Sequence, residues 1–123
     1  MFPGLKTRVS FVGYRDFTLK HQYRKKDFTE NLKSIIQFID GQRAHSEGNG
    51  IEKTKRDWPE DVQGGFNIAL NELKWSENSA KFAFHIADAP GHGRDICETV
   101  DQFPGGSPDG HRIQNQMQQF AER

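Results

Sequence analysis

The first regular pattern along the chain is an alternation of side chains with a period of two over residues 7–14. The β-branched and aromatic residues of this segment (VSFVGY) predict a strand. Apolar side chains lie on both faces near its end, which is typical of an interior strand in an α/β sheet. Arg15 and Asp16 follow at its carboxyl end. The basic stretch at 20–28 predicts a short edge strand, because charged side chains such as Lys25 discourage further pairing.

A helical period predicts a helix over residues 30–40. Its apolar residues recur at helical spacing and form a single stripe, made of Leu32, Ile35, Ile36 and Ile39. Thr29 is expected to cap the beginning of this helix, and Glu30 suits the positive end of its dipole. Gly41 is expected to end it.

A second helical period begins at Pro59, a residue that suits the first position of a helix, and continues to Trp75. Gly64 and Gly65 lie inside this segment, and each costs roughly 1 kcal/mol relative to alanine. We therefore expect the glycine pair to pack closely against a neighbouring element. Between the two helices, residues 42–56 are polar and aperiodic, which predicts a long exposed loop.

The apolar segment at 80–87 (AKFAFHIA) predicts a second strong strand, which leads into Asp88 and a sharp Pro-Gly turn. Residues 93–108 are rich in glycine and proline and indicate a loop, and a last helix is expected over 110–122. The order strand, helix, helix, strand, helix indicates the α/β class. Ligands of open α/β sheets bind beyond the carboxyl ends of the strands, so Asp16 and Asp88 mark the expected site.

Charge and composition exclude several classes of protein. The 17 basic and 17 acidic side chains give zero net charge, unlike a phosphate-seeking nucleic-acid-binding protein. The single cysteine, Cys97, excludes an internal disulfide framework and a multi-cysteine zinc module. The sequence contains no apolar run of the ~20 residues that span a bilayer, and its first residues lack the apolar stretch of a signal peptide. These features predict an intracellular, cytoplasmic protein.

Asp88 is the sharpest chemical signal, because it follows an apolar strand directly and precedes a tight turn. Carboxylates on strand ends are the ligands that Mg²⁺ prefers, but aspartate also caps turns, and the sequence leaves these two interpretations balanced. Asp57 is placed to direct a carboxylate into the same cleft, although an ordinary helix cap is the favoured interpretation of this residue.

The histidines His85, His92 and His111, with Asp88 and Asp95, suggest a second hypothesis, a metal-assisted hydrolase. His85 and Asp88 fall on opposite faces of a regular strand, which weakens a shared metal site for this pair. His92 is better placed, on the loop after Asp88. No three-ligand zinc spacing is recognisable, and Cys97 has no paired base that would indicate a nucleophile.

Three segments together resemble one known family: VSFVGYRDF at 9–17, DWPEDVQGGFNIAL at 57–70, and FHIADAPGHG at 84–93, followed by DQFPGGSPDG at 101–110. In this order the chain is similar to the von Willebrand factor A-like domain of eukaryotic proteins that join such a domain to an alpha-type protein kinase. The resemblance implies one domain over residues 1–123, with a partial doubly wound, Rossmann-like sheet and flanking helices. It also implies a protein-binding module without catalysis, no kinase domain and no nucleic-acid partner.

The same resemblance implies a metal-dependent adhesion site that holds Mg²⁺. Asp88 stands at the family's acidic ligand after the central strand, Asp57 stands in its second metal loop, and Asp16 is placed to contribute through a water. The family's Asp-x-Ser-x-Ser loop is absent, so we expect weak binding of Mg²⁺. The chain resembles a domain truncated at both ends, and a truncated alpha-kinase-associated regulatory domain without independent activity is a further hypothesis.

The missing loop belongs to the family's central strand, which the segments at 7–14 and 80–87 would flank. We therefore expect these two segments either to pair directly or to be bridged by a partner chain or a missing segment that completes the sheet. Geometry separates the binding module from the hydrolase. A pocket shared by His92 and Asp88 within coordination distance of one site favours the hydrolase. Convergence of Asp57 with Asp88, with His92 turned away, favours the binding module.

Overall fold

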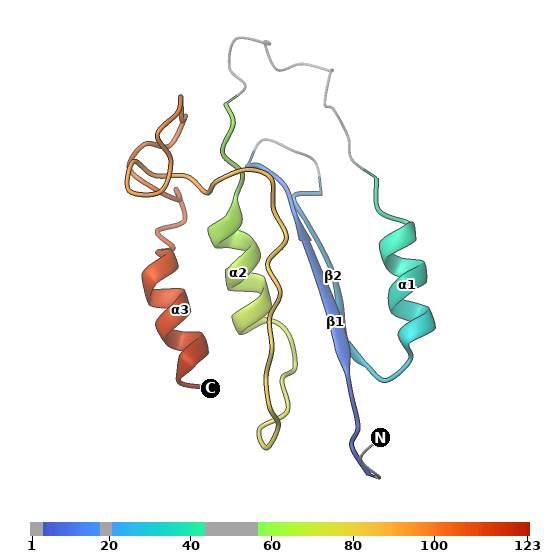
Figure 1. Ribbon diagram of the computed structural model, residues 1–123. Helices are drawn as coiled ribbons and strands as arrows, with labels where there is room; N and C mark the ends of the chain where they lie inside the picture. The colour runs from blue at the N-terminus through green and yellow to red at the C-terminus, as the bar shows by residue number, and fades with distance from the viewer. Residues whose placement is uncertain (1–3, 18–20, 44–56) are drawn as a thin grey trace.

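A computed structural model describes residues 4–17, 21–43 and 57–123 of the chain. The described residues form a mixed α/β structure with one two-stranded sheet and three helices (Figure 1). In chain order, these elements are β1 (Val9–Tyr14), β2 (Tyr23–Thr29), α1 (Leu32–Asp40), α2 (Val62–Asn71) and α3 (Ile113–Ala121). No described helix has both the length and the apolar character needed to cross a membrane.

The two strands form an antiparallel hairpin. Tyr14 pairs with Tyr23 at one end and Val9 pairs with Thr29 at the other, with an irregularity in register between Val9 and Phe11. The first strand and the short basic edge strand predicted from the sequence are both confirmed, because their alternation and β propensity already agree with the pairing.

Helices pack on both faces of this hairpin (Figure 1). On one face, the ring of Phe11 contacts Phe38 of α1 at a centroid distance of 6.0 Å. On the other face, Tyr14 lies against Gly65 of α2, where an added Cβ would come within 2.5 Å of the tyrosine ring. The expected close packing of the glycine pair is therefore confirmed, since a side chain at this position would push α2 away from the strand.

The core is centred on α2, with α3 packed on its outer side (Figure 1). The amide of Gln116 donates a 2.8 Å hydrogen bond to the carbonyl of Gln63, which joins the two helices through a buried contact. The buried apolar side chains are Ile35, Val62, Ile68, Leu70, Leu73 and Cys97. Cys97, which lies in the loop predicted over residues 93–108, is therefore buried.

The helices begin at other residues than those predicted. Asn31, rather than Thr29, caps α1 by accepting a 3.1 Å hydrogen bond from the backbone of Ser34. Asp61 caps α2 through the backbone N–H of Gly64, so Pro59 lies before the helix rather than in its first turn. Gly41 ends α1 as expected. The predicted loop at 42–56 lies, beyond residue 43, outside the described residues.

The segment at 80–87 is not a strand, and this prediction is wrong. It runs alongside β1 in the same direction (Figure 1), but no backbone ladder joins the two. Its apolar side chains Phe82, Phe84 and Ile86 are 75%, 88% and 89% exposed. The apolar pattern of residues 80–87 is typical of an interior strand. A strand forms, however, only where a neighbouring backbone edge lies within pairing distance. The expected direct pairing is therefore absent, and a doubly wound sheet is not confirmed.

Candidate functional site: a cleft beside the free edge of the sheet

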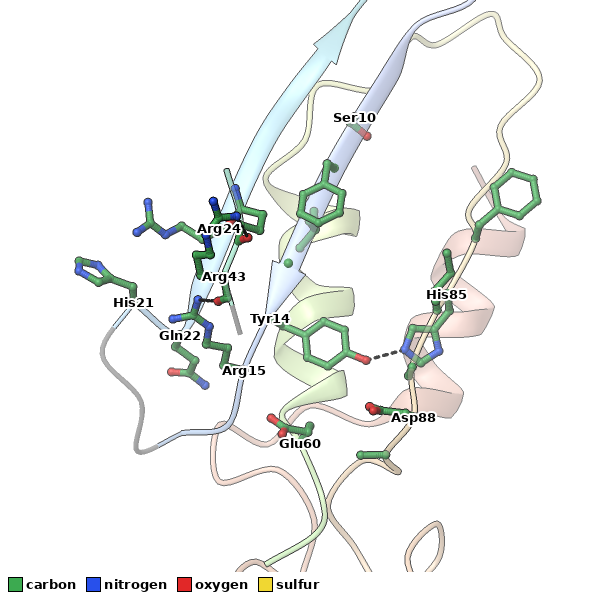
Figure 2. A pocket seen from close by; sticks show the side chains of 18 residues that line it. Ser10, Tyr14, Arg15, His21, Gln22, Arg24, Arg43, Glu60, His85 and Asp88 are labelled. Carbon is green, nitrogen blue, oxygen red and sulfur yellow. Dashed lines mark hydrogen bonds between the residues drawn. The ribbon is translucent and has the colours of Figure 1, made fainter. Parts of the chain in front are cut away.

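A cleft of about 580 Å³ separates β1 from the segment that was expected to be a strand. Residues 10–14 of β1 form one wall, and residues 84–89 form the other (Figure 2). A volume of this size is typical of ligand-binding sites, which commonly enclose roughly 300–1,000 Å³. The two expected sheet segments therefore face each other across an open space instead of pairing.

Tyr14 and His85 span this cleft. The Tyr14 hydroxyl lies 2.8 Å from Nε2 of His85 (Figure 2). The ring of His85 packs at a tilt against the ring of Phe66 on α2, at a centroid distance of 5.1 Å. Burial, followed by the negative charges of Glu60 and Asp88, raises the pKa of Tyr14. The phenol therefore stays protonated at neutral pH, and its hydroxyl can donate the hydrogen bond to the imidazole.

The carboxyl end of the cleft is acidic, with Glu60 and Asp88 at its mouth (Figure 2). Burial and the nearby charges of Asp16 and Asp88 raise the pKa of Glu60. The backbone of Glu60 donates a 2.9 Å hydrogen bond to Pro90, so the chain leading into α2 holds the turn after Asp88 in place. Arg15, Arg24 and Arg43 line the same pocket, so its charge is mixed (Figure 2).

Asp88 is exposed at this mouth. Within the described ranges, no hydrogen bond to its carboxylate is found, so the alternative that Asp88 caps its own turn has no support there. Its oxygens are therefore available to a ligand from outside the chain.

The other two predicted metal ligands, Asp16 and Asp57, lie in a different group, the His92 cluster, formed by Asp16, Asp57, His92 and Asp101. The imidazole of His92 is fully buried, with Nδ1 2.7 Å from Asp101 and Nε2 2.9 Å from Asp16. Asp57 lies 3.8 Å from Nδ1. Burial lowers the pKa of His92, but the hydrogen bonds to Asp101 and Asp16 outweigh this and raise it overall.

The His92 cluster joins three separate segments of the chain. Asp16 follows β1, Asp57 precedes α2, and Asp101 lies in the long loop before α3. Asp101 also accepts hydrogen bonds of 2.7 Å from the backbones of Gly93 and Phe103, which help to lower its pKa against the effect of burial. Through these contacts, the polar groups of the cluster hold the loop before α3 against the sheet.

Asp57, His92 and Asp101 offer ligand atoms within 4.8 Å of one another, a spacing that a metal ion could bridge. However, Asp57 already accepts a 2.6 Å hydrogen bond from the backbone of Gln102, and both nitrogens of His92 face carboxylates. The cluster therefore resembles a buried ion-pair network with satisfied groups. Sequence reasoning missed Asp101, whose distance of nine residues from His92 matches no ligand motif.

The residues of the hydrolase hypothesis do not converge. His92 belongs to the buried cluster, Asp88 lines the cleft, and Asp95 faces Gln114 of α3 at 3.4 Å. The convergence of Asp57 with Asp88 that would favour the binding module is also not seen, because Asp57 lies with His92. Glu60 links the cleft with the His92 cluster, because the charges of both Asp88 and Asp16 raise its pKa.

Comparisons with known proteins found one informative similarity. The chain is 33% identical over 110 residues to the alpha-protein kinase vwkA of Dictyostelium discoideum. The match covers 89% of this chain but 16% of that protein, so the chain spans about a sixth of its relative's length. No family model matches the chain, and no solved structure matches it. The expected link to alpha-kinase proteins is therefore supported at the level of this similarity, and a von Willebrand factor A domain is not shown by a family match.

Proposed function

We propose that this chain is a protein-interaction module of the von Willebrand factor A type and that the cleft beside β1 is its binding site. The observation that carries the proposal is the row of Phe82, Phe84 and Ile86, which are 75%, 88% and 89% exposed beside the cleft. Contiguous exposed apolar side chains mark surfaces that bind other proteins. The similarity to part of an alpha-protein kinase supports a module that works within a larger protein.

A metal contribution to this site is a further part of the proposal. Carboxylate oxygens suit Mg²⁺, and Asp88 has no competing hydrogen bond among the described residues. Asp16 and Asp57 fit less well, because His92 and the backbone of Gln102 already use their oxygens. We therefore propose weak Mg²⁺ binding at Asp88 that a carboxylate of the partner completes; Asp16 and Asp57 could join it only by leaving these hydrogen bonds.

Catalysis is not part of the proposed function. In a hydrolase the histidine must reach its substrate or metal, whereas the ring of His92 is fully buried and hydrogen-bonded at both nitrogens. The binding module explains the exposed apolar row, for which the hydrolase hypothesis offers no role.

The binding function can be tested with a photo-crosslinking residue, benzoylphenylalanine, at position 84. A matched control carries the same residue at Val100, which is 81% exposed but does not line the cleft. A protein crosslinked at position 84 alone is then purified, and its Kd is measured by titration. We expect Phe84→Ser to raise that Kd at least tenfold, a loss of about 1.4 kcal/mol, and Val100→Ser to leave it unchanged. Equal effects of the two variants would refute the proposal.

The metal contribution can be tested by isothermal titration of the chain with Mg²⁺ and with Mn²⁺. We expect weak binding that disappears in Asp88→Asn, because the ligand set is incomplete. Asp95→Asn is the control, since Asp95 lies against α3 away from the cleft. Tight binding, or binding that survives the loss of Asp88, would contradict this part of the proposal.

A further inference from the structure

We propose that the chain binds a phosphate group where β1 ends and β2 begins, and that a phosphorylated serine or threonine of a protein partner carries this phosphate. The site is formed by Arg15, Arg24 and Arg43, which together are named the arginine cluster. The inference rests on the proposed function, because the arginine cluster lines the proposed binding cleft and specifies one chemical group of its partner.

The pairing of β1 with β2 places Arg15 and Arg24 on the same face of the hairpin. Gly13 pairs with Arg24, and the backbone N–H of Arg15 donates a 2.9 Å hydrogen bond to the carbonyl of Gln22. Because side chains alternate along a strand, residues 13, 15, 22 and 24 share one face. Arg15 and Arg24 are therefore diagonal neighbours, at a spacing of about 7–8 Å that long side chains can bridge.

The third arginine comes from the chain just after α1, which packs on this same face of the hairpin. Phe11 of β1 contacts Phe38 of α1. Beyond the end of the helix, Nη2 of Arg15 donates a 2.7 Å hydrogen bond to the backbone carbonyl of Arg43. Nη1 of Arg43 donates in turn to the carbonyl of Asp40, at 2.8 Å. These contacts bring three guanidinium groups from three segments of the chain to one place.

The arginine cluster keeps donors and positive charge that the described residues do not use. Arg24 is exposed, and within those residues its side chain forms no hydrogen bond or ion pair. Arg43 is also exposed and bonds only through Nη1, so its Nη2 and Nε groups remain available in the described part of the chain. Glu60 and Asp88, the carboxylates of the cleft, lie on the other side of β1 (Figure 2). The side of the cleft towards α1 is therefore positive.

Three guanidinium groups suit a phosphate better than a carboxylate. Each guanidinium presents a planar fork of N–H donors that matches two oxygens of a phosphate. A phosphoserine carries about 1.5 to 2 negative charges at neutral pH and three acceptor oxygens. A carboxylate has a single charge and two oxygens, so it would neutralise less of the arginine cluster. Arginine clusters are a recurring means of recognising phosphorylated segments of proteins.

The surroundings of the arginine cluster favour a phosphorylated protein over a nucleic acid or a membrane. Nucleic acids and anionic membranes are bound by extended basic surfaces that contact many phosphates. Lys25, next to Arg24 in β2, faces the opposite side of the hairpin and pairs there with Glu72. The basic run at 24–26 therefore does not form one continuous strip. The arginine cluster instead continues into the cleft of the proposed function.

The probe is a fluorescein-labelled peptide with one phosphoserine flanked on each side by Gly-Ala-Gly. Titration with the chain, followed by fluorescence polarisation, is expected to show saturable binding. The same peptide with serine or glutamate in place of phosphoserine is expected to bind at least about tenfold more weakly, because it offers less charge and fewer oxygens. Absence of binding, or equal affinity of the phosphoserine and glutamate peptides, would overturn the assignment to phosphate.

A matched pair of variants in β2 tests the position of the site. Arg24→Gln is expected to weaken binding of the phosphopeptide at least about fivefold, because it removes charged hydrogen-bond donors. Arg24→Lys, which keeps the charge but loses the planar fork, is expected to have an intermediate effect. Lys25→Gln removes the same charge one position away, on the opposite face, and is expected to leave the affinity within about twofold. Equal losses in Arg24→Gln and Lys25→Gln would refute the site.

Further probes identify the source of the phosphate. Inorganic phosphate is expected to displace the phosphopeptide, but with an affinity at least about tenfold lower than that of the peptide. A single-stranded DNA oligonucleotide, and vesicles of phosphatidylcholine with phosphatidylserine, are expected not to bind the chain. If any of these three probes binds more tightly than the phosphopeptide, the assignment to a phosphorylated protein is wrong.

The outcomes distinguish this inference from the proposed function. Phosphatase treatment of a protein crosslinked at position 84 is expected to raise its Kd at least about fivefold. If that Kd does not change while Phe84→Ser still weakens binding, the cleft remains the interaction site and the phosphate inference is refuted. If the phosphopeptide binds through Arg24 but Phe84→Ser and Val100→Ser have equal effects on the crosslinked protein, the phosphate site stands and the proposed function fails.

Discussion

The His92 cluster and the cleft wall at residues 82–87 differ in how far their side chains are exposed to solvent. In the cluster, a fully buried imidazole meets carboxylates on both sides, and the side chains of Asp57 and Asp101 are 2% and 3% exposed. In the cleft wall, large apolar side chains lie almost entirely in solvent. The first region satisfies its polar groups within the chain, and the second leaves both its apolar surface and its backbone edge for another molecule. This contrast separates what maintains the fold from what is available for binding.

The largest effect in this comparison is expected for His92→Ala. The substitution leaves three carboxylates without the group that separates and binds them, and breaking a buried ion pair typically costs about 3–5 kcal/mol. Urea unfolding should show this loss in the free energy of unfolding. The control is His111→Ala, which is outside the cluster and is expected to change stability by less than about 0.5 kcal/mol. Similar results for the two variants would mean that the cluster is not structural.

A smaller effect is expected from pH. Because the pKa of His92 in the folded chain is raised above 6.5, its contribution to stability is fully present below pH 6.5. This contribution is lost as the pH rises through the raised pKa, when the imidazole gives up the proton that binds its carboxylates. Unfolding midpoints measured over about four pH units around the usual histidine pKa should fall on the alkaline side.

The control for this pH series is His92→Gln, in which the alkaline decrease should be reduced. A midpoint that rises from acid to neutral pH in the parent chain, with no decrease beyond it, would show that the histidine is not held in its charged form.

The smallest effect is expected for Phe84→Ser. Since this side chain is 88% exposed, its removal should change the free energy of unfolding by no more than about 0.5 kcal/mol. Leu70→Ala, at a side chain that is 2% exposed, should cost about 2–5 kcal/mol in the same assay. If Phe84→Ser lowered the free energy of unfolding almost as much as Leu70→Ala, the cleft wall would be part of the core. The contrast between the two regions would then fail.

Local patterns predicted most of the regular elements. The apolar stripe of Leu32, Ile35, Ile36 and Ile39 placed α1, although it was Asn31 that capped the helix. The glycine pair correctly indicated close packing, because Gly65 has room for nothing larger against Tyr14. The apolar pattern at 80–87 predicted a strand, which is wrong: the structure gives that segment no strand partner among the described residues and leaves Phe82, Phe84 and Ile86 exposed.

The candidate site was predicted in part. Asp88 lies at the mouth of a cleft beyond the end of β1, as expected from the rule for ligand sites in α/β sheets. Asp16 and Asp57 were expected to lie with Asp88, but they surround His92 instead. The sequence did not identify Asp101 as a site residue. Its contact with His92 depends on the path of an irregular loop that has no local sequence signature.

The sequence by itself determined where strands and helices begin and end to within a few residues, because periodicity, capping and β propensity are properties of neighbouring residues. Only the tertiary structure decided that residues 80–87 remain unpaired, that three aspartates and a histidine from distant parts of the chain form one buried cluster, and that a cleft opens beside β1. These features depend on contacts between distant segments. Their energy comes from burial and hydrogen bonding across the fold, which no local pattern encodes.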